Sequence, residues 1–489
     1  MRLFGFKPED GGAAGDTMPF FWDGEWHIFY LKPRIGAWGF PTRTCNDLGH
    51  VVSSDLVEWR ILPDAFGPGG PGSPDADGIW TGSLVEHEGT FHFFYTGYNR
   101  EHPNQQRICH ATSLDLIAWT KDPANPLFAA DPRWYEPIDW RDPFVHRDQA
   151  TGQFQMLIAA RENEGPMLRR GCIALATSDD LARWDVHPPL WRPRLTHVME
   201  CPELFTLDGW WYLIFSRYSE HAQTVYRVSR SPDGPWEARP LDSLDGRRFY
   251  AAKSCTDGTQ RITFAWTHER THEKAAADWE WGGHFGSPRE LVALPEGTLV
   301  CRMPAALAAT RGPAEAIVVE GQWGDWRQYD ATLAGNAVGT YGYAFLDVER
   351  SDLWIETELE IEAGTHSAGF LLETDDGLSN GYEIAIEPLA RRVTLSRWPH
   401  AMDPLWQRLA PGEIAEPTVD TPLVVRPFAI MPSDNRYRLR LLSRGSMMEC
   451  FVCDQVVLTF RIYEQAPRPL GLFVQEGRAR FHRLGVSAT

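Results

Sequence analysis

The chain contains 489 residues, more than one hydrophobic core usually holds, so we expect two domains. Hydrophobic residues make up 43% of the sequence and charged residues 23%, which is typical of a globular protein. The net charge of −19 argues against nucleic acid and anionic membrane surfaces as partners, and fits a neutral substrate. No apolar stretch approaches the ~20 residues of a membrane span.

Residues 1–12 have no apolar run behind their basic residues, so we expect no signal peptide and a cytoplasmic location. An internal repeat follows. Each copy is an apolar or aromatic run, a turn with an acidic residue and a glycine, and a second apolar run, which predicts a β-hairpin. The five copies span residues 20–30, 84–95, 144–158, 204–215 and 257–266.

A second element follows the first three hairpins and ends in the pattern Asp-Leu-x-x-Trp. It occurs at residues 53–59, 112–119 and 177–184, with a weaker version at 229–236. We interpret it as the turn between the outer two strands of a propeller blade. Five units of four strands predict an all-β fold that begins with a five-bladed β-propeller over residues 1–300, in preference to a coincidental all-β sandwich.

From residue 315 the hairpin rhythm stops, and period-two alternation continues at 354–361, 369–372, 437–442 and 446–452. Antiparallel strands at this density predict a β-sandwich over residues 315–489. Residues 301–314 are expected to form a linker, with a short helix between Met303 and Pro313.

Eight cysteines are scattered along the chain, and only Cys450 and Cys453 have a spacing that a metal site would use. No second pair completes a zinc site, so we expect free thiols in a reducing compartment. The sequence holds no other group of ligands at metal-binding spacing. We therefore expect neither a metal nor another cofactor.

Three carboxylates stand at equivalent points of the repeat, before the hairpin turn of their own blade. Asp16 lies seven residues before Asp23, Asp142 six before Asp148, and Glu200 eight before Asp208. This register places all three at the start of an innermost strand, beside the central channel. The corresponding points of the other blades hold Trp80-Thr81-Gly82-Ser83 and Tyr250-Ala251-Ala252-Lys253.

Each acid also has an ordinary structural interpretation. Asp16 follows a glycine-rich stretch and suits a turn, Asp142 can pair with Arg141, and Glu200 can be an exposed strand end. Together and in register, the three favour an active site, because converging carboxylates repel each other and are costly to bury. Two carboxyl groups facing one glycosidic bond are what glycoside hydrolysis requires. Met199 and Cys201 give Glu200 apolar neighbours, which would favour its protonated form and make it the acid.

The motifs around these acids resemble those of glycoside hydrolase family 32, the invertase, levanase and inulinase family. The matching segments are Arg141-Asp142-Pro143, Glu200-Cys201-Pro202, Trp80-Thr81-Gly82-Ser83, residues 48–59 and Ser287-Pro288-Arg289-Glu290-Leu291. The likeness spans roughly residues 14–310. It implies a β-propeller followed by a β-sandwich and a retaining enzyme that cleaves fructofuranosyl linkages of sucrose, fructo-oligosaccharides or fructans, with or without fructosyl transfer.

The resemblance also implies roles for individual residues. Asp16 would be the nucleophile, Glu200 the acid and then the base, and Asp142 a stabiliser of the transition state that Arg141 orients. The candidate substrate-binding residues are Arg141, Trp38, Trp80, Thr81, Tyr250 and Trp266.

One motif departs from the family pattern. Where the family has Asn-Asp-Pro-Asn-Gly, this chain has Gly15-Asp16-Thr17-Met18-Pro19. The glutamine that usually follows the first hairpin is replaced by Leu31 and Lys32. The aspartate is retained, but amide donors expected near the sugar hydroxyls are missing.

Two other functions compete with this one. A related five-bladed family acts on pentofuranosides or xylosides with two aspartates and a glutamate, and many of its members invert. A propeller without catalytic activity could instead bind sugars. The expected partner is in each case a small sugar or oligosaccharide, and homo-oligomerisation is left open.

Overall fold

The computed structural model describes residues 1–8, 12–39, 42–219, 221–315, 317–348, 352–398 and 423–488. The chain divides into two compact units, Met1–Leu299 and Val300–Thr489. Among the described residues, no helix has the length and hydropathy needed to span a membrane.

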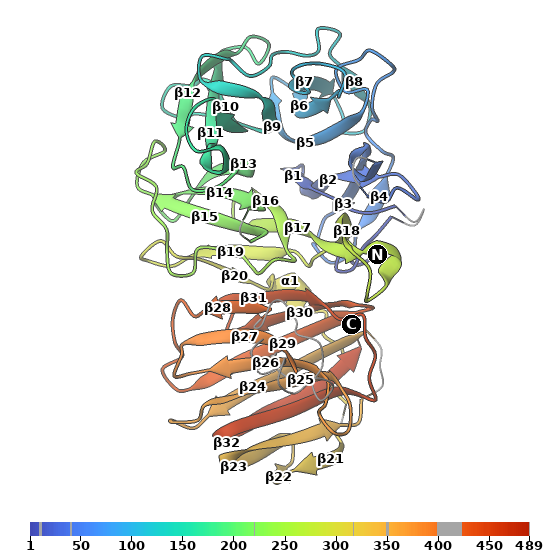
Figure 1. The fold of residues 1–489 in the computed structure, drawn as a ribbon, viewed down its shortest axis with the longest axis vertical. Coiled ribbons are helices and arrows are strands. Elements are labelled where there is room, and N and C mark those ends of the chain that lie inside the picture. The colour runs from blue at the N-terminus through green and yellow to red at the C-terminus, as the bar shows by residue number, and fades with distance from the viewer. Residues whose placement is uncertain are drawn as a thin grey trace, which may run out of the picture. The chain divides into compact units, whose positions relative to one another are not determined.

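Unit 1 is a five-bladed β-propeller, as predicted (Figure 1). Blade 1 contains β1 (Thr17–Trp22), β2 (Glu25–Pro33), β3 (Asn46–Ser53) and β4 (Arg60–Leu62). Blade 2 contains β5 (Gly78–His87), β6 (Thr90–Tyr98), β7 (Gln106–Ser113) and β8 (Trp119–Lys121). Blade 3 contains β9 (Tyr135–Arg147), β10 (Phe154–Glu162), β11 (Gly171–Ser178) and β12 (Asp185–Trp191).

Blades 4 and 5 differ from the four strands predicted for each blade. Blade 4 has three strands, β13 (Glu200–Leu207), β14 (Trp210–Arg217) and β15 (Gln223–Ser229). The next segment contains Pro232, Pro235 and Pro240, which cannot donate to a ladder, and only isolated bridges such as Val228 to Glu237 form there. Blade 5 has five strands, β16 (Tyr250–Thr256), β17 (Arg261–Arg270), β18 (Trp279–Phe285), β19 (Arg289–Ala293) and β20 (Leu299–Arg302). Short 3₁₀ turns occur at Thr42–Thr44, Met167–Arg169 and Thr271–Glu273.

The predicted hairpin turns of blades 1, 2 and 4 have two consecutive residues with positive φ. In blade 1 these are Asp23 (φ 46°) and Gly24 (φ 79°), between Trp22 and Glu25, which pair with each other. This geometry matches the right-handed twist of the strands and favours an acidic residue followed by glycine. The repeated dipeptide therefore sets the register of these hairpins.

The Asp-Leu-x-x-Trp elements connect the third and fourth strands of blades 1 to 3, as predicted. In blade 1, Asp55 Oδ1 accepts hydrogen bonds from the backbone N–H groups of Val57 and Glu58, both 2.8 Å long. Leu56 is left-handed (φ 66°), and its carbonyl accepts a 3.1 Å bond from Trp59 Nε1. The same bonds recur in blades 2 and 3, so the motif is a structural turn.

Unit 2 consists of antiparallel strands, as predicted for the β-sandwich. They are β21 (Val319–Trp323), β22 (Asp325–Tyr329), β23 (Thr332–Leu346), β24 (Leu353–Ile361), β25 (Ser367–Thr374), β26 (Gly381–Glu387), β27 (Arg392–Trp398), β28 (Val424–Pro427), β29 (Arg436–Arg444), β30 (Met447–Val452), β31 (Val456–Arg461) and β32 (Arg468–Ala488). The last strand, β32, pairs with β23, β24 and β25. It therefore joins the strands into one hydrogen-bonded network.

The helix in the predicted linker is shorter than expected. α1 spans only Ala305–Ala308, because β20 occupies the chain up to Arg302 and Pro304 lies at the N-terminal cap. The whole linker was predicted to span residues 301–314, and β20 occupies the first two of these residues.

Two histidine pairs lie in blades 1 and 2, and all four rings are buried except that of His92, which is half-buried. His27 Nδ1 lies 3.0 Å from His50 Nε2, and His92 Nδ1 lies 3.0 Å from His110 Nε2. Burial, together with the neighbouring histidine, lowers the pKa of His50 to about 3 and that of His92 to about 4. Both rings are therefore neutral in the folded protein at pH values where an unfolded histidine, with a pKa of about 6.5, already binds a proton.

We predict that these histidines destabilise the fold as the pH falls from about 6.5 towards 4. The His50→Gln, His92→Gln double variant should lose part of this dependence. Its free energy of unfolding, relative to wild type, should rise as the pH is lowered from 7 to 4.5. Denaturant unfolding at each pH measures this free energy. The exposed His102 provides a matched control for replacing a histidine by glutamine. The same pH dependence in His102→Gln and in the double variant would contradict the prediction.

Candidate active site

The predicted acids of blades 1, 3 and 4 line one cavity of about 520 Å³ in unit 1. Asp16 directly precedes β1, Asp142 lies within β9, and Glu200 is the first residue of β13. In Figure 1 the innermost strands β1, β5, β9, β13 and β16 face a common centre. The register argument therefore located the acids correctly, although β9 begins seven residues before Asp142.

Four innermost strands carry a β-bulge where they reach this cavity. The bulges interrupt the ladders between Trp80 and Gly82 of β5, at residues 142–143 of β9, 201–202 of β13 and 251–252 of β16. Asp142, Cys201 and Ala251 have positive φ values of 58°, 49° and 54°. Bulges re-aim side chains, and left-handed non-glycine residues cost of order 1–2 kcal/mol each. Because the bulge recurs in four blades, it indicates that these blades direct side chains into the cavity in the same way.

Asp16 is held by two donors from other blades. Thr81 Oγ1 donates to Asp16 Oδ2 at 2.5 Å, and Trp266 Nε1 donates to Oδ1 at 2.7 Å. Asp16 itself is only 8% exposed. Both oxygens are thus fixed in direction.

Asp142 lies beside Asp16 across the Cys201 thiol. Cys201 Sγ is 3.6 Å from Asp16 Oδ2 and 3.6 Å from Asp142 Oδ2. The backbone N–H of Cys201 donates to Asp142 Oδ2 at 2.9 Å, and the N–H of Asp142 donates to Thr96 Oγ1 at 2.8 Å. The bulges of β9 and β13 are therefore bonded to each other.

Burial and the charges of neighbouring carboxylates raise the proton affinity of both aspartates. Burial raises the pKa of Asp16 to about 7, assisted by the charges of Asp142 and Glu200 and opposed by the bonds from Thr81 and Trp266. Burial also raises the pKa of Asp142 to about 6, although the charge of Arg141 lowers it. The two carboxyl groups therefore titrate near neutral pH.

Glu200 is surrounded by polar groups, which corrects the expectation of an apolar environment. Arg141 Nη2 donates to its Oε1 at 3.0 Å, and the Tyr250 hydroxyl donates to its Oε2 at 2.5 Å. The strand neighbours Met199 and Cys201 are buried, but the bulge turns the carboxylate of Glu200 towards Arg141. Arg141 also bonds Asp139 at 2.5 Å and Gln106 at 3.1 Å.

Most of the predicted substrate-binding residues meet in the cavity. Arg141, Trp80, Thr81 and Tyr250 line it, and the ring of Trp80 stacks on Tyr98 at 4.4 Å. Trp266 is fully buried and acts through its bond to Asp16.

Trp38 is absent from the cavity lining, which corrects its assignment to the wall. The guanidinium of Arg43 lies 4.6 Å from its ring centre, and the His272 ring is equally close. Arg43 is anchored by an ion pair with the buried Glu269, so the ring of Trp38 packs on an arginine that is fixed outside the cavity lining.

Sequence reasoning missed several other residues that line the cavity, namely Gln106, Tyr98, Asp139, Tyr218, His268 and Trp281. Tyr98 ends the second strand of blade 2, and Gln106 begins the third. Since innermost strands begin at the cavity, second strands end there and third strands begin there. Polar or aromatic residues at those strand ends were the available signal.

Glu269, Glu273 and His284 offer ligand atoms within 4.8 Å of one another, a cluster that linear spacing did not reveal. Glu269 is already engaged by Lys7 at 2.6 Å and by Arg43. The positive charges of Lys7 and Arg43 thus balance the negative charge of Glu269, the most buried residue of this cluster.

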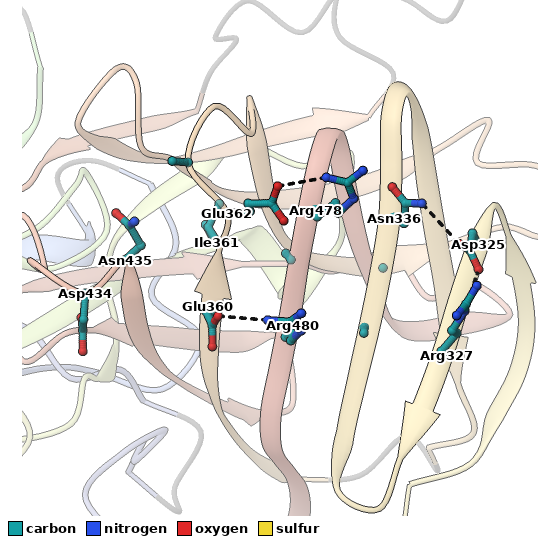
Figure 2. A pocket seen from close by; sticks show the side chains of 14 residues that line it. Asp325, Arg327, Asn336, Glu360, Ile361, Glu362, Asp434, Asn435, Arg478 and Arg480 are labelled. Carbon is teal, nitrogen blue, oxygen red and sulfur yellow. Dashed lines mark hydrogen bonds and ion pairs between the residues drawn. The ribbon is translucent and has the colours of Figure 1, made fainter.

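Unit 2 contains a hollow of about 530 Å³ with a different character (Figure 2). Arg478 pairs with Glu362 at 2.9 Å, and Arg480 with Glu360 at 3.2 Å, between neighbouring strands. These acids are neutralised by arginines on an open surface. The crowded, buried carboxylates of unit 1 therefore remain the candidate active site.

Comparison with known proteins agrees with this site. The family described as "Glycosyl hydrolases family 32 N-terminal domain" matches residues 6–302. An insoluble β-fructofuranosidase isoenzyme of Arabidopsis thaliana is 27% identical over 322 residues, covering 58% of this chain and 54% of that protein. A sucrose-6-phosphate hydrolase of Zymomonas mobilis is 29% identical over 299 residues, covering 55% of this chain and 56% of that protein. The matched regions thus span about half the length of these curated relatives.

The fold is shared with solved structures over nearly the whole chain. Fructan 1-exohydrolase IIa from Cichorium intybus has a TM-score of 0.70 at 18% identity, covering 99% of this chain and 97% of that one. A β-fructofuranosidase from Bombyx mori has a TM-score of 0.69, also at 18% identity, covering 100% of this chain and 95% of that one. With the family match covering more than half of the sequence, the chain belongs to family 32 of the glycosyl hydrolases.

Proposed function

We propose that this protein is a retaining glycoside hydrolase that cleaves fructofuranosyl linkages of sucrose, fructo-oligosaccharides or fructans. The observation that carries the proposal is the paired geometry of Asp16 and Glu200. One carboxylate is fixed by two hydrogen-bond donors, and the other is held by Arg141 and Tyr250 in the same cavity. The names of the relatives, which include β-fructofuranosidases and a fructan 6-exohydrolase from Beta vulgaris, support the substrate class.

In the proposed first step, an Asp16 oxygen forms a bond to the anomeric carbon of the fructosyl unit. Glu200 gives its proton to the glycosidic oxygen as the bond to the leaving group breaks. Asp142 accepts hydrogen bonds from sugar hydroxyls, and these strengthen as positive charge develops on the ring. In the second step, Glu200 takes a proton from water, whose oxygen displaces Asp16. A sugar acceptor in place of water would give fructosyl transfer.

The protonation states suit this sequence. Asp16 must be ionised to attack, so with a pKa of about 7 it gains activity as the pH rises through that value. The phenol of Tyr250 and the guanidinium of Arg141 hold the Glu200 carboxyl in place for both proton transfers.

A cytoplasmic location, the absence of a cofactor requirement and the absence of nucleic-acid or membrane partners stay predictions. The free state of all eight cysteines supports a reducing compartment.

The proposal is tested by incubating the purified protein with sucrose, sucrose 6-phosphate, inulin and levan and separating the products. With methanol as acceptor, the configuration of the methyl fructofuranoside can be read by NMR, because it cannot mutarotate. We expect fructose from at least one substrate and the β-anomer from a β-fructofuranoside. The inverted anomer would favour the inverting pentosidase-like mechanism, and binding without turnover would favour a sugar-binding propeller.

Removal of each acid should affect a different step. Asp16→Ala should abolish turnover of every substrate, because no other group forms the covalent intermediate. Glu200→Ala should reduce kcat by roughly 10²–10⁴-fold on sucrose, and by less on an aryl fructoside whose leaving group scarcely needs a proton. The exposed Asp185 on β12 gives a matched control, and its alanine variant should resemble wild type. Equal losses on both substrates for Glu200→Ala would contradict its role as the acid.

The hydrogen bond from Thr81 should set the acidic limb of the pH profile. This bond lowers the pKa of Asp16, so Thr81→Val should raise it and move the acidic limb of kcat/KM to higher pH. At pH 6 the loss should be roughly tenfold, and it should shrink above pH 8. Thr81→Ser, which keeps the hydroxyl, is the control. A loss that is independent of pH would show that Thr81 acts in another way.

A further inference from the structure

The first motif of this chain lacks the amide side chains that the family usually places beside the nucleophile. In the structure, Leu31 lines the cavity in the region where the sequence pattern expects a glutamine. A leucine cannot bond a sugar hydroxyl. Asn46 also lines the cavity, but its Nδ2 donates to the carbonyls of Thr44 and Ile79, at 3.1 and 3.4 Å.

Gln106 brings an amide into the same cavity from blade 2. It begins β7, lines the cavity and is 6% exposed. Its Oε1 accepts two hydrogen bonds, from the backbone N–H of Trp140 at 3.0 Å and from Arg141 Nη1 at 3.1 Å. Both partners are donors only, so the amide has one orientation: a flipped group would set its NH₂ against two other donors.

This orientation determines what Gln106 can offer. With Oε1 occupied, Nε2 is the free end of the amide. It has no hydrogen-bond partner among the described residues, and it is not among the buried polar atoms enclosed by protein. A nearly buried donor with an open side, next to the arginine that bonds Glu200, suits an acceptor oxygen of a ligand in the cavity.

We propose that Gln106 is a specificity-determining residue, whose Nε2 donates a hydrogen bond to a hydroxyl oxygen of the bound fructoside. This inference rests on the proposed function and adds a contact to it. A site that hydrogen-bonds a substrate hydroxyl rejects an analogue without that hydroxyl, because the protein group is then left unpaired. Gln106 thereby supplies an amide donor in a site whose first motif has lost its own.

Two variants separate this donor from the structural role of the same side chain. Gln106→Glu keeps an acceptor for Trp140 and Arg141 but loses the NH₂ donor. Gln106→Met is uncharged and of similar length, and it loses both the acceptor and the donor. The midpoint of its thermal unfolding reports the cost of leaving the Trp140 N–H unpaired. Gln153→Met is the matched control, since Gln153 lies in the exposed turn between β9 and β10 and bonds Asp179 at 2.8 Å.

The experiment measures kcat/KM for sucrose and for sucrose analogues in which one hydroxyl at a time is replaced by hydrogen. Wild type and Gln153→Met should lose roughly tenfold on one of the analogues. Both Gln106 variants should be roughly tenfold slower than wild type on sucrose itself, and should lose nothing further on that analogue. Profiles at several pH values separate the charge of Gln106→Glu from the loss of the donor.

Each outcome decides the proposal. Gln106 variants that discriminate among the analogues as wild type does would overturn it, as would a wild type that is indifferent to every deletion. In both cases turnover of sucrose would leave the proposed function intact. A wild-type protein that cleaves neither sucrose nor any other fructoside would overturn the proposed function and this inference together.

Discussion

Two carboxylates buried side by side impose the main physical constraint on unit 1. Asp16 and Asp142 both contact the thiol of Cys201, and the charge of Asp142 raises the cost of ionising Asp16. Such a pair persists only if the surrounding structure supplies donors and positive charge. Thr81 of blade 2 supplies a donor to Asp16 of blade 1, so this bond depends on how the two blades are placed. Arg141 supplies positive charge to Asp142, its neighbour on β9.

The propeller meets this constraint by repeating one distortion. Each innermost strand of blades 2 to 5 is interrupted by a bulge at the cavity, and three of these bulges contain a left-handed residue that is not glycine. The conformation costs energy at each position, and hydrogen bonds between bulges, such as that from Cys201 N–H to Asp142, offset part of it. A rigid ring of blades thus holds groups whose charges would otherwise drive them apart.

The motifs that carry the family resemblance have unequal roles in this structure. Asp55 and Trp59 form a turn at the outer edge of a blade, and Arg289 is fully buried in an ion pair with Asp245 at 2.7 Å. These residues maintain the scaffold. The acids themselves are retained, whereas Leu31 lines the cavity where the family pattern has a glutamine. Gln106 is our proposal for one contact that compensates for this replacement.

The sequence by itself determined the hairpin repeat, the turn motif, the antiparallel strands of unit 2 and the register of the three acids. All of these depend on residues close together in the chain, whose spacing follows directly from strand and turn geometry. Pro232, Pro235 and Pro240 were a local signal against a fourth strand in blade 4. The fifth strand of blade 5 could not be predicted, because the pairing of β17 with both β18 and β19 depends on how the chain folds back.

Only the tertiary structure decided the surroundings of each acid. The partners of Asp16 are Thr81 and Trp266, which lie 65 and 250 residues away in the chain. Glu200 was expected among apolar neighbours, but it faces Arg141 and Tyr250, because the bulge that follows it turns the strand. Proton affinities and ligand contacts depend on such groups brought together through space, and linear spacing carries no record of them.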